Sequence, residues 1–91
     1  MFSLLDFKIG MVVRSKAGRD KGDLFIVLRT EDNYAYIANG ILRKVERPKK
    51  KKLMHLQPSG HISSLIKDRL EAAEEVTNCQ VRKALAEYSE N

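Results

Sequence analysis

From Lys8 onward, short apolar runs alternate with groups of turn residues, a pattern typical of small antiparallel β structure. The second run, LFIVL, is apolar at consecutive positions, as in a strand that is covered on both sides. We therefore expect five strands in the first half of the chain. They are predicted at residues 11–15, 24–29, 34–38, 41–45 and 53–56.

Turn residues mark the connections between these strands. The two glycines of the loop AGRDKG can adopt the positive φ that a tight loop requires. The dipeptide Asn39-Gly40 fits a two-residue type I′ hairpin turn between the third and fourth strands. Pro48 cannot donate to a strand ladder, and the lysines after it repel one another. We therefore predict a basic loop over residues 43–52, before a last strand that covers the edge of the sheet.

The second half of the chain changes to a helical period. A proline and a glycine within residues 57–61 predict a break, after which Ser63 or Ser64 can cap a helix. Apolar residues then recur at spacings of three and four, so we predict a first helix over about residues 63–76. The apolar stripe consists of Ile62, Leu65, Ile66, Leu70 and Ala73.

A second helix is predicted over about residues 78–89. Thr77 followed by Gln80 matches a capping box, which would start a new helix at this point. The residues after it form a second apolar stripe at helical spacing, so two short helices fit better than one long helix. This stripe consists of Val81, Ala84, Leu85 and Tyr88.

These elements predict a mainly β protein with α. A chain of 91 residues makes one domain. We expect a small β-barrel over residues 1–57 and a helical tail over residues 58–91. A barrel of this size has little core, so the helical stripes are expected to pack back on it. They are equally compatible with a groove for a protein partner.

Composition excludes several classes of protein. The chain is 43% hydrophobic and 32% charged, as in an ordinary globular chain. Its longest apolar runs are far shorter than the roughly 20 residues of a membrane span. The N-terminal stretch MFSLLDFKIG contains Asp6 and Lys8 and lacks a charged leader or cleavage site, so it does not resemble a signal peptide. With a single cysteine, Cys79, no internal disulfide is possible. We expect a cytoplasmic protein.

The net charge of +5 is unevenly distributed. Residues 1–56 hold 13 Lys/Arg against 6 Asp/Glu, whereas residues 57–91 hold 4 against 6. A polyanionic partner is therefore expected to bind the first half. The density of cations in the basic loop suits phosphate neutralisation, although a merely solvated loop is the common fate of surface lysines. These cations are Arg43, Lys44, Arg47, Lys49, Lys50, Lys51 and Lys52.

Four further cations extend this predicted basic surface. Arg19 and Lys21 lie in the loop AGRDKG and can reach phosphate, but a structural turn in which Asp20 satisfies local amides is about as well supported. Arg14 and Lys16 share one strand face and are expected to point to solvent beside that loop.

Other candidate sites are weaker. Tyr34 and Tyr36 share a strand face and can stack on unpaired bases, but cross-strand packing explains them as well. His55, His61 and Cys79 are too few for a zinc site, which needs four ligands. Nothing positions a catalytic base or an oxyanion hole. We expect no enzyme activity, no cofactor, no metal and no small-molecule substrate.

The segment GMVVRSKAGRDKGDLFIV resembles the KOW motif, in which a glycine-containing loop joins two strands. The matching positions are Gly10, Val13, Gly18, Gly22 and Val27, and the run MHL at residues 54–56 is similar to the end of such a domain. The resemblance covers roughly residues 8–57. It is to KOW-domain RNA-binding proteins related to archaeal and eukaryotic large-subunit ribosomal proteins. It implies a five-stranded SH3-like barrel that binds RNA through its loops and adjacent basic residues.

Residues and resemblance together predict an RNA-binding accessory protein that acts in translation, with the ribosome or ribosomal RNA as its partner. One alternative is a protein-interaction adaptor that holds a partner through its helices. A transcription-associated KOW factor, which contacts polymerase or nascent RNA, shares the same barrel and is a third possibility. The helix residues that would serve an adaptor are Leu65, Leu70, Val81 and Leu85.

Overall fold

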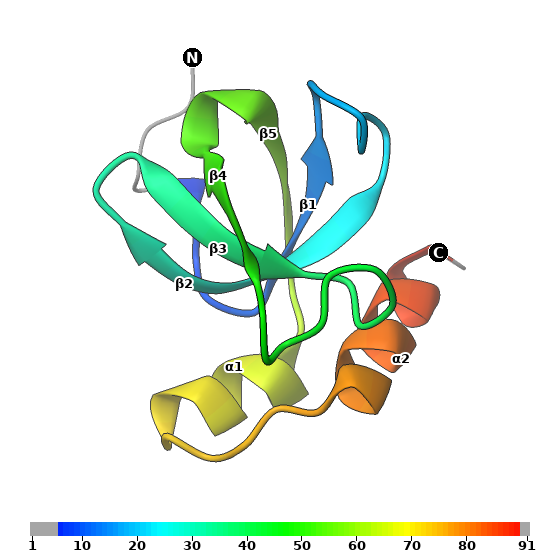
Figure 1. Cartoon of the computed structure of the whole chain (residues 1–91). Coiled ribbons are helices and arrows are strands. Elements are labelled where there is room, and N and C mark those ends of the chain that lie inside the picture. The colour runs from blue at the N-terminus through cyan, green and yellow to red at the C-terminus, as the bar shows by residue number, and fades with distance from the viewer. Residues whose placement is uncertain (1–5, 90–91) are drawn as a thin grey trace.

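The computed structural model describes residues 6–89. The barrel was predicted from residue 1 and the helical tail to residue 91. Residues 1–5 and 90–91 of these predictions lie outside the described residues. The described residues form five strands and two α-helices. Figure 1 shows the helices together on one side of the strands. The elements are β1 Met11–Ser15, β2 Leu24–Glu31, β3 Tyr34–Ala38, β4 Lys49–Lys52, the 3-10 turn η2 Leu53–His55, β5 Leu56–Ile62, α1 Ser64–Glu71 and α2 Asn78–Ser89.

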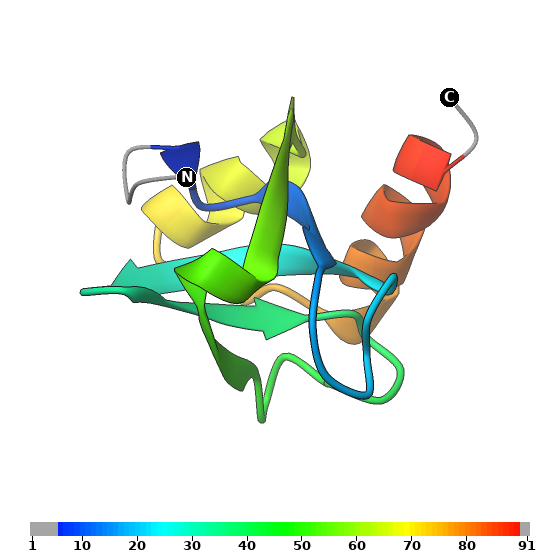
Figure 2. The same ribbon diagram turned by 90° about the horizontal axis from the view of Figure 1, so that it is seen from above.

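The strands form one antiparallel sheet in the order β4-β3-β2-β1-β5. The prediction of a mainly β protein with α is confirmed. The sheet is strongly twisted, and Figure 2 shows β5 running across the direction of β2 and β3. Within residues 6–89, the edge strands β4 and β5 are joined by η2 but do not pair with each other, so the sheet is not closed.

Two apolar clusters lie on the two faces of the sheet. Because successive strand residues point to opposite faces, the run LFIVL supplies both clusters. Phe25 and Val27 pack in the first cluster with Ile37, whereas Ile26 packs in the second with Ile66 of α1. The prediction that this strand is covered on both sides is therefore confirmed.

The helices pack back on the sheet, as expected. Val81 of α2 is fully buried in the second cluster, and Leu70 and Leu85 pack against it. The helix α2 has the predicted bounds, but α1 is shorter than predicted. It ends at Glu71 because Ala73 adopts a φ of 57°, which the helix cannot continue through.

Both predicted helix starts carry caps. The Ser63 hydroxyl, and not that of Ser64, accepts a hydrogen bond from the Ile66 N–H. The capping box before α2 is reciprocal: the Thr77 N–H donates to the Gln80 side chain at 3.0 Å, and the Gln80 N–H donates to the Thr77 hydroxyl at 3.1 Å. This box separates α2 from α1, as predicted.

The predictions for residues 39–56 need correction. Residues 49–52 form the strand β4 and not a loop, since Lys49 pairs with Ile37 of β3. The strands predicted at 41–45 and 53–56 are absent: the first lies in the loop 39–48, and most of the second forms η2. The Asn39 side-chain oxygen accepts hydrogen bonds from the N–H groups of Ile41 and Arg43. A local turn thus occupies backbone donors that a strand would need.

The tight hairpin also lies elsewhere. Its two-residue turn is Asp32-Asn33 between β2 and β3, because Glu31 pairs with Tyr34 and Asp32 adopts a φ of 53°. Aspartate tolerates this left-handed conformation better than most residues. Asn39-Gly40 instead begins the long β3–β4 loop.

The predicted break at 57–61 forms part of β5. Pro58 is tolerated there because β5 is an edge strand, where a missing N–H need not face a neighbour. The predicted boundary after residue 57 therefore falls inside a strand. Of the helices in residues 6–89, none is long and apolar enough to cross a membrane.

Candidate nucleic-acid interface

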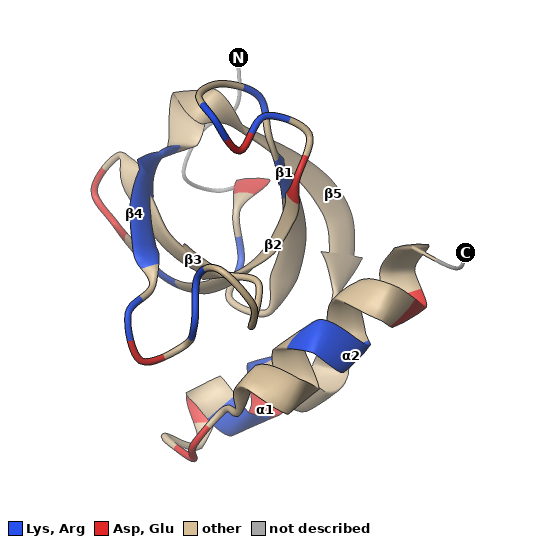
Figure 3. Ribbon diagram, turned by 45° about the vertical axis from the view of Figure 1, so that its right-hand side comes forward, with Lys and Arg blue, Asp and Glu red and all other residues tan. Residues whose placement is uncertain are grey.

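The four lysines of β4 divide between two surfaces. Because strand side chains alternate, Lys49 and Lys51 point to the side of the glycine loop, residues 16–23, while Lys50 and Lys52 point to the other side. Figure 3 shows β4 as lysine along its whole length, with further cations in the glycine loop and the β3–β4 loop. The lysine run is thus not one uniform patch.

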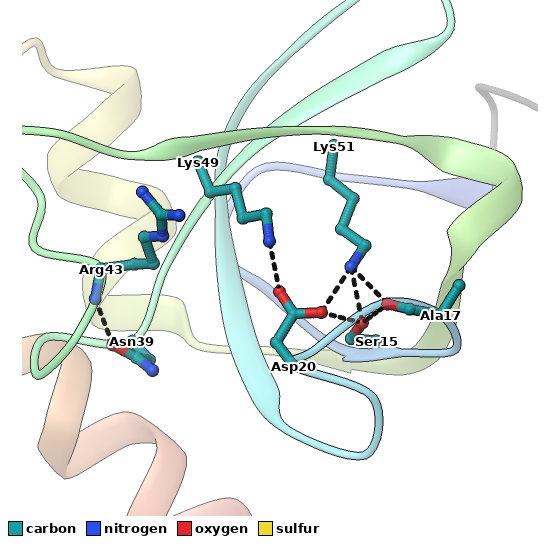
Figure 4. A network of polar contacts seen from close by, with 7 residues as sticks. All are labelled: Ser15, Ala17, Asp20, Asn39, Arg43, Lys49 and Lys51. Carbon is teal, nitrogen blue, oxygen red and sulfur yellow. Dashed lines mark hydrogen bonds and ion pairs between the residues drawn. The ribbon is translucent and has the colours of Figure 1, made fainter.

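Lys51 is buried, with 7% of its side chain exposed. Its ammonium donates hydrogen bonds to the Ser15 hydroxyl and the Ala17 carbonyl, both at 2.8 Å, and to Asp20 Oδ1 at 2.5 Å. Lys49 Nζ pairs with the other carboxylate oxygen of Asp20 at 2.8 Å. Figure 4 shows both lysines reaching from β4 to this one carboxylate.

Asp20 carries the negative charge that these lysines require. Burial acts to raise the pKa of its carboxyl, but hydrogen bonds from Lys49, Lys51 and Ser15 outweigh that effect and hold the pKa well below its usual value. The carboxylate therefore stays ionised. The sequence interpretation of Asp20 as an acceptor for local amides is replaced by an ion pair that fastens the glycine loop to β4.

The β3–β4 loop, residues 39–48, is held by α2. Asn78 Oδ1 accepts a hydrogen bond from the Val45 N–H at 2.8 Å, and Asn78 Nδ2 donates to both carboxylate oxygens of Glu46. This amide hydrogen bond lowers the pKa of Glu46. The Arg82 guanidinium donates to the Gly40 carbonyl at 2.7 Å. The loop therefore has a fixed shape, although Leu42 is 82% exposed.

The two loops meet at one hollow of about 280 Å³. Arg19, Asp20 and Asp23 line it from the glycine loop, Arg43 from the β3–β4 loop and Lys49 from β4. The fold thus brings Arg19 together with two predicted site residues, Arg43 and Lys49, that lie more than 20 positions later in the sequence. Besides Lys16 at the start of the glycine loop, five cations of these two loops are exposed: Arg19, Lys21, Arg43, Lys44 and Arg47.

The remaining predicted cations lie at the margin of this surface. Arg14 is exposed on β1, and its guanidinium donates to the Gly22 carbonyl at 2.7 Å. Lys16 is exposed at the start of the glycine loop, where its N–H donates to the His55 carbonyl. The expectation that both side chains reach the surface beside this loop is confirmed.

A second group of cations lies against tyrosine rings on the other side of β4. The Arg29 guanidinium is 3.9 Å from the centre of the Tyr36 ring. The Lys50 ammonium is 4.5 Å from the Tyr34 ring and 5.9 Å from the Tyr36 ring. Arg29 was not among the residues predicted from the sequence. Its position opposite Tyr36 depends on an irregularity of register between Val27 and Arg29, for which the sequence gives no signal.

The side chains weighed as metal ligands are dispersed. Within residues 6–89, no group of three or more His, Cys, Asp or Glu side chains is placed to hold a metal ion. The His61 ring packs against Tyr88 at 5.4 Å between centroids, and Cys79 is exposed on α2.

Comparison with protein-family models and with curated proteins gives no match for this chain. The resemblance to KOW domains therefore depends on the residues quoted for it above.

Proposed function

We propose that this protein binds RNA through phosphate contacts from the glycine loop and the β3–β4 loop. One observation carries the proposal: cations from both loops converge on one hollow, while Asp20 within it is already neutralised by two lysines. Asp20 therefore does not cancel the field of the loop cations, and Asp23, the other acid that lines the hollow, is outnumbered by Arg19 and Arg43. A concentrated positive surface of this kind attracts a polyanion.

The proposed interface differs from the set predicted from sequence. Lys51 is left out, because its ammonium is buried and has three hydrogen-bond partners. Lys49 remains at the hollow with Asp20. Lys50 and Lys52 belong to the opposite surface of β4. The five exposed loop cations, with Arg14 and Lys16 at the margin, form the phosphate-binding set.

We also propose that the sheet is an SH3-like barrel of the KOW type. Two backbone hydrogen bonds support this, because they join η2, which links the two edge strands, to the residue after β1 and to the β2–β3 turn. The Lys16 N–H donates to the His55 carbonyl, and the Leu53 N–H donates to the Asn33 carbonyl, both at 2.8 Å. Gly18 and Gly22 of the KOW resemblance have positive φ, at 85° and 94°, as a glycine-dependent loop requires.

The direct test is RNA binding as a function of salt. With roughly five phosphate contacts, the logarithm of the binding constant should fall with the logarithm of salt at a slope of about −3 to −5. Fluorescence anisotropy with a labelled RNA at several salt concentrations measures this slope. A slope near zero, or the absence of binding at low salt, would contradict the proposal.

We propose the ribosome or its RNA, in the cytoplasm, as the site of action. Sedimentation of the tagged protein with ribosomal subunits at low salt tests this. Co-sedimentation supports a role in translation. If the protein binds RNA but is absent from the subunit fractions, the transcription-associated role is favoured instead.

The packing of the helices favours RNA binding over the adaptor. Leu70, Val81 and Leu85 pack in or against the second cluster, and only Leu65 of the four adaptor residues is largely exposed, at 50%. Pull-down from lysate with and without RNase separates the two functions. Partners that are lost after RNase treatment support RNA binding.

A further inference from the structure

We propose that the protein has a second RNA site, at which unpaired bases stack on the tyrosine face, defined as Arg29, Tyr34, Tyr36 and Lys50. This inference rests on the proposed RNA-binding function and deepens it. It assigns the ligand at this face as the bases of single-stranded RNA, whereas the loop hollow binds phosphates. The two sites lie on opposite sides of β4.

The register of the sheet builds this face. Tyr36 of β3 pairs with Arg29 on one side and with Lys50 on the other, so a ring lies between two cations in a row across three strands. Tyr34 points to the same side, two residues away, which separates the two side chains by about 7 Å along the strand. Aromatic side chains on a sheet surface provide stacking platforms for neighbouring bases of a single strand.

A groove of about 670 Å³ begins at this face and runs toward the α1–α2 connection. Arg29 and Tyr36 line one end, and Pro48 and Val76 give it apolar walls. Its volume lies in the range of about 300–1,000 Å³ that is usual for small-ligand sites. The groove can therefore accept a planar base beside the Tyr36 ring.

Two carboxylates determine which part of a nucleotide enters this groove. Glu46 and Glu75 both line it, so it repels phosphate. The Glu46 carboxylate is held in place by the Asn78 amide and keeps acceptor capacity for the amino group of a base. Lys50 and Lys52 lie outside the groove, on exposed positions of β4, where phosphates can be bound. The groove therefore favours a base, and the exposed lysines favour the phosphates.

The cations on the rings do not block stacking. Arg29 and Lys50 are exposed, and an exposed cation–π contact is weaker than a base–aromatic stack. A base can displace either cation, which then remains close enough to pair with the adjoining phosphate. The guanidinium plane of Arg29 also offers a stacking surface of its own.

The expected ligand is single-stranded because bases in a duplex are stacked on one another and cannot splay onto a ring. β4 is an edge strand, so a single strand can cross it from the loop hollow to the tyrosine face. Lys49 faces the hollow and Lys50 faces the tyrosines. The phosphates of the RNA strand therefore meet a cation on each side of β4.

The test compares a short single-stranded RNA with a duplex RNA of equal charge. Replacing both rings, in Tyr34→Leu/Tyr36→Leu, should weaken binding of the single strand by about 10-fold or more and change duplex binding by no more than about twofold. Tyr34→Phe/Tyr36→Phe keeps the stacking surface and should bind as the unmodified protein. Tyr88→Phe changes the tyrosine of α2, away from this face, and is the matched control.

A second measurement uses the unmodified protein and does not depend on the folding of a variant. The chain has three tyrosines and no tryptophan, so the tyrosine ring protons can be followed individually by NMR. Adding the single strand should shift the ring protons of Tyr34 and Tyr36 upfield and leave those of Tyr88 unchanged. The duplex should cause no such shift.

The outcomes separate this inference from the proposed function. In one outcome, RNA binding depends on salt but not on the two rings, and the ring protons do not shift. This result would overturn the stacking site alone and would leave the tyrosine face to a protein partner. Failure to bind any RNA would overturn both proposals.

Discussion

Lys51 is the residue on which the arrangement of the basic surface depends. Placing an ammonium in a protein interior costs several kcal/mol unless it is paired and its protons have acceptors. Here Asp20, Ser15 and Ala17 supply those acceptors. The same ion pair fixes the glycine loop on β4, so the stability of the fold and the position of Arg19 depend on one carboxylate.

Removing the charge of Asp20 should therefore destabilise the protein. Asp20→Asn is expected to lower the free energy of unfolding at pH 7 by about 3 kcal/mol, because it leaves a buried ammonium without its counter-charge. Urea unfolding measures this change. Asp23→Asn, an exposed acid of the same loop, is the matched control and should change stability by no more than about 0.5 kcal/mol. Equal effects of the two substitutions would contradict the role of Asp20.

The lowered pKa of Asp20 also predicts how stability depends on pH. In the unfolded chain this carboxyl takes up a proton near its usual value of 3.8, and in the folded protein only at lower pH. The unfolded state therefore binds more protons in this window, so the contribution of Asp20 is complete well above pH 3.8 and is lost as the pH falls through and below it. The unmodified protein should lose more stability than Asp20→Asn between pH 5 and pH 2. Parallel stability profiles for the two proteins would contradict this.

Gly40 is a residue where the β3–β4 loop approaches α2. A Cβ at this position would lie 2.6 Å from the Asn78 carbonyl oxygen. Gly60 has nearly the same φ, 78° against 77°, but a Cβ there would meet nothing within 4 Å. Gly60→Ala should therefore cost only the backbone strain, about 1 kcal/mol, and Gly40→Ala about 1–3 kcal/mol more. Thermal or urea unfolding of the pair measures the difference, and equal losses would contradict the close approach.

At the scale of elements, local signals predicted some segments and failed at others. β1, β3 and α2 have their predicted bounds because alternation and the Thr77–Gln80 capping box act within a few residues. The strand β4 was missed because the repulsion among its lysines is relieved by Asp20, which lies about 30 residues earlier in the chain. No local pattern contains that information.

The capping box gives a prediction at this scale. Thr77→Ala removes the acceptor for the Gln80 N–H and should destabilise the protein by about 1 kcal/mol. Thr77→Ser keeps the hydroxyl and should cost less than half as much. Denaturant unfolding of both variants checks the difference. The same loss in both would show that the cap hydroxyl does not stabilise α2.

At the scale of the whole molecule, the helices complete the sheet and position its functional loop. They cover the face that carries Val12 and Ile26, and Asn78 and Arg82 hold the β3–β4 loop. The prediction that the helices pack back on the sheet followed from the small size of the core. The contacts of α2 with the β3–β4 loop could not be predicted in this way, because they depend on which side chains face the loop in the folded protein.

The candidate site was predictable in composition but not in arrangement. Charge density identified Arg43 and Lys49, and the loop AGRDKG identified Arg19; the fold places these three at one hollow. Charge density could not distinguish the buried Lys51 from the exposed Lys50, since both belong to the same run of lysines. Arg29 was missed because strand register, which the sequence does not reveal, places it opposite Tyr36.

The measurement that tests the central claim most directly is the salt dependence of RNA binding after the hollow loses one cation from each loop. Arg19→Gln/Arg43→Gln should make the log–log slope shallower by about 1.5 and weaken binding at low salt, because two phosphate contacts are lost. Lys67→Gln/Lys83→Gln removes the same charge from the helices and should leave the slope unchanged. Equal changes of slope in the two variants would contradict a localised phosphate site formed by the two loops.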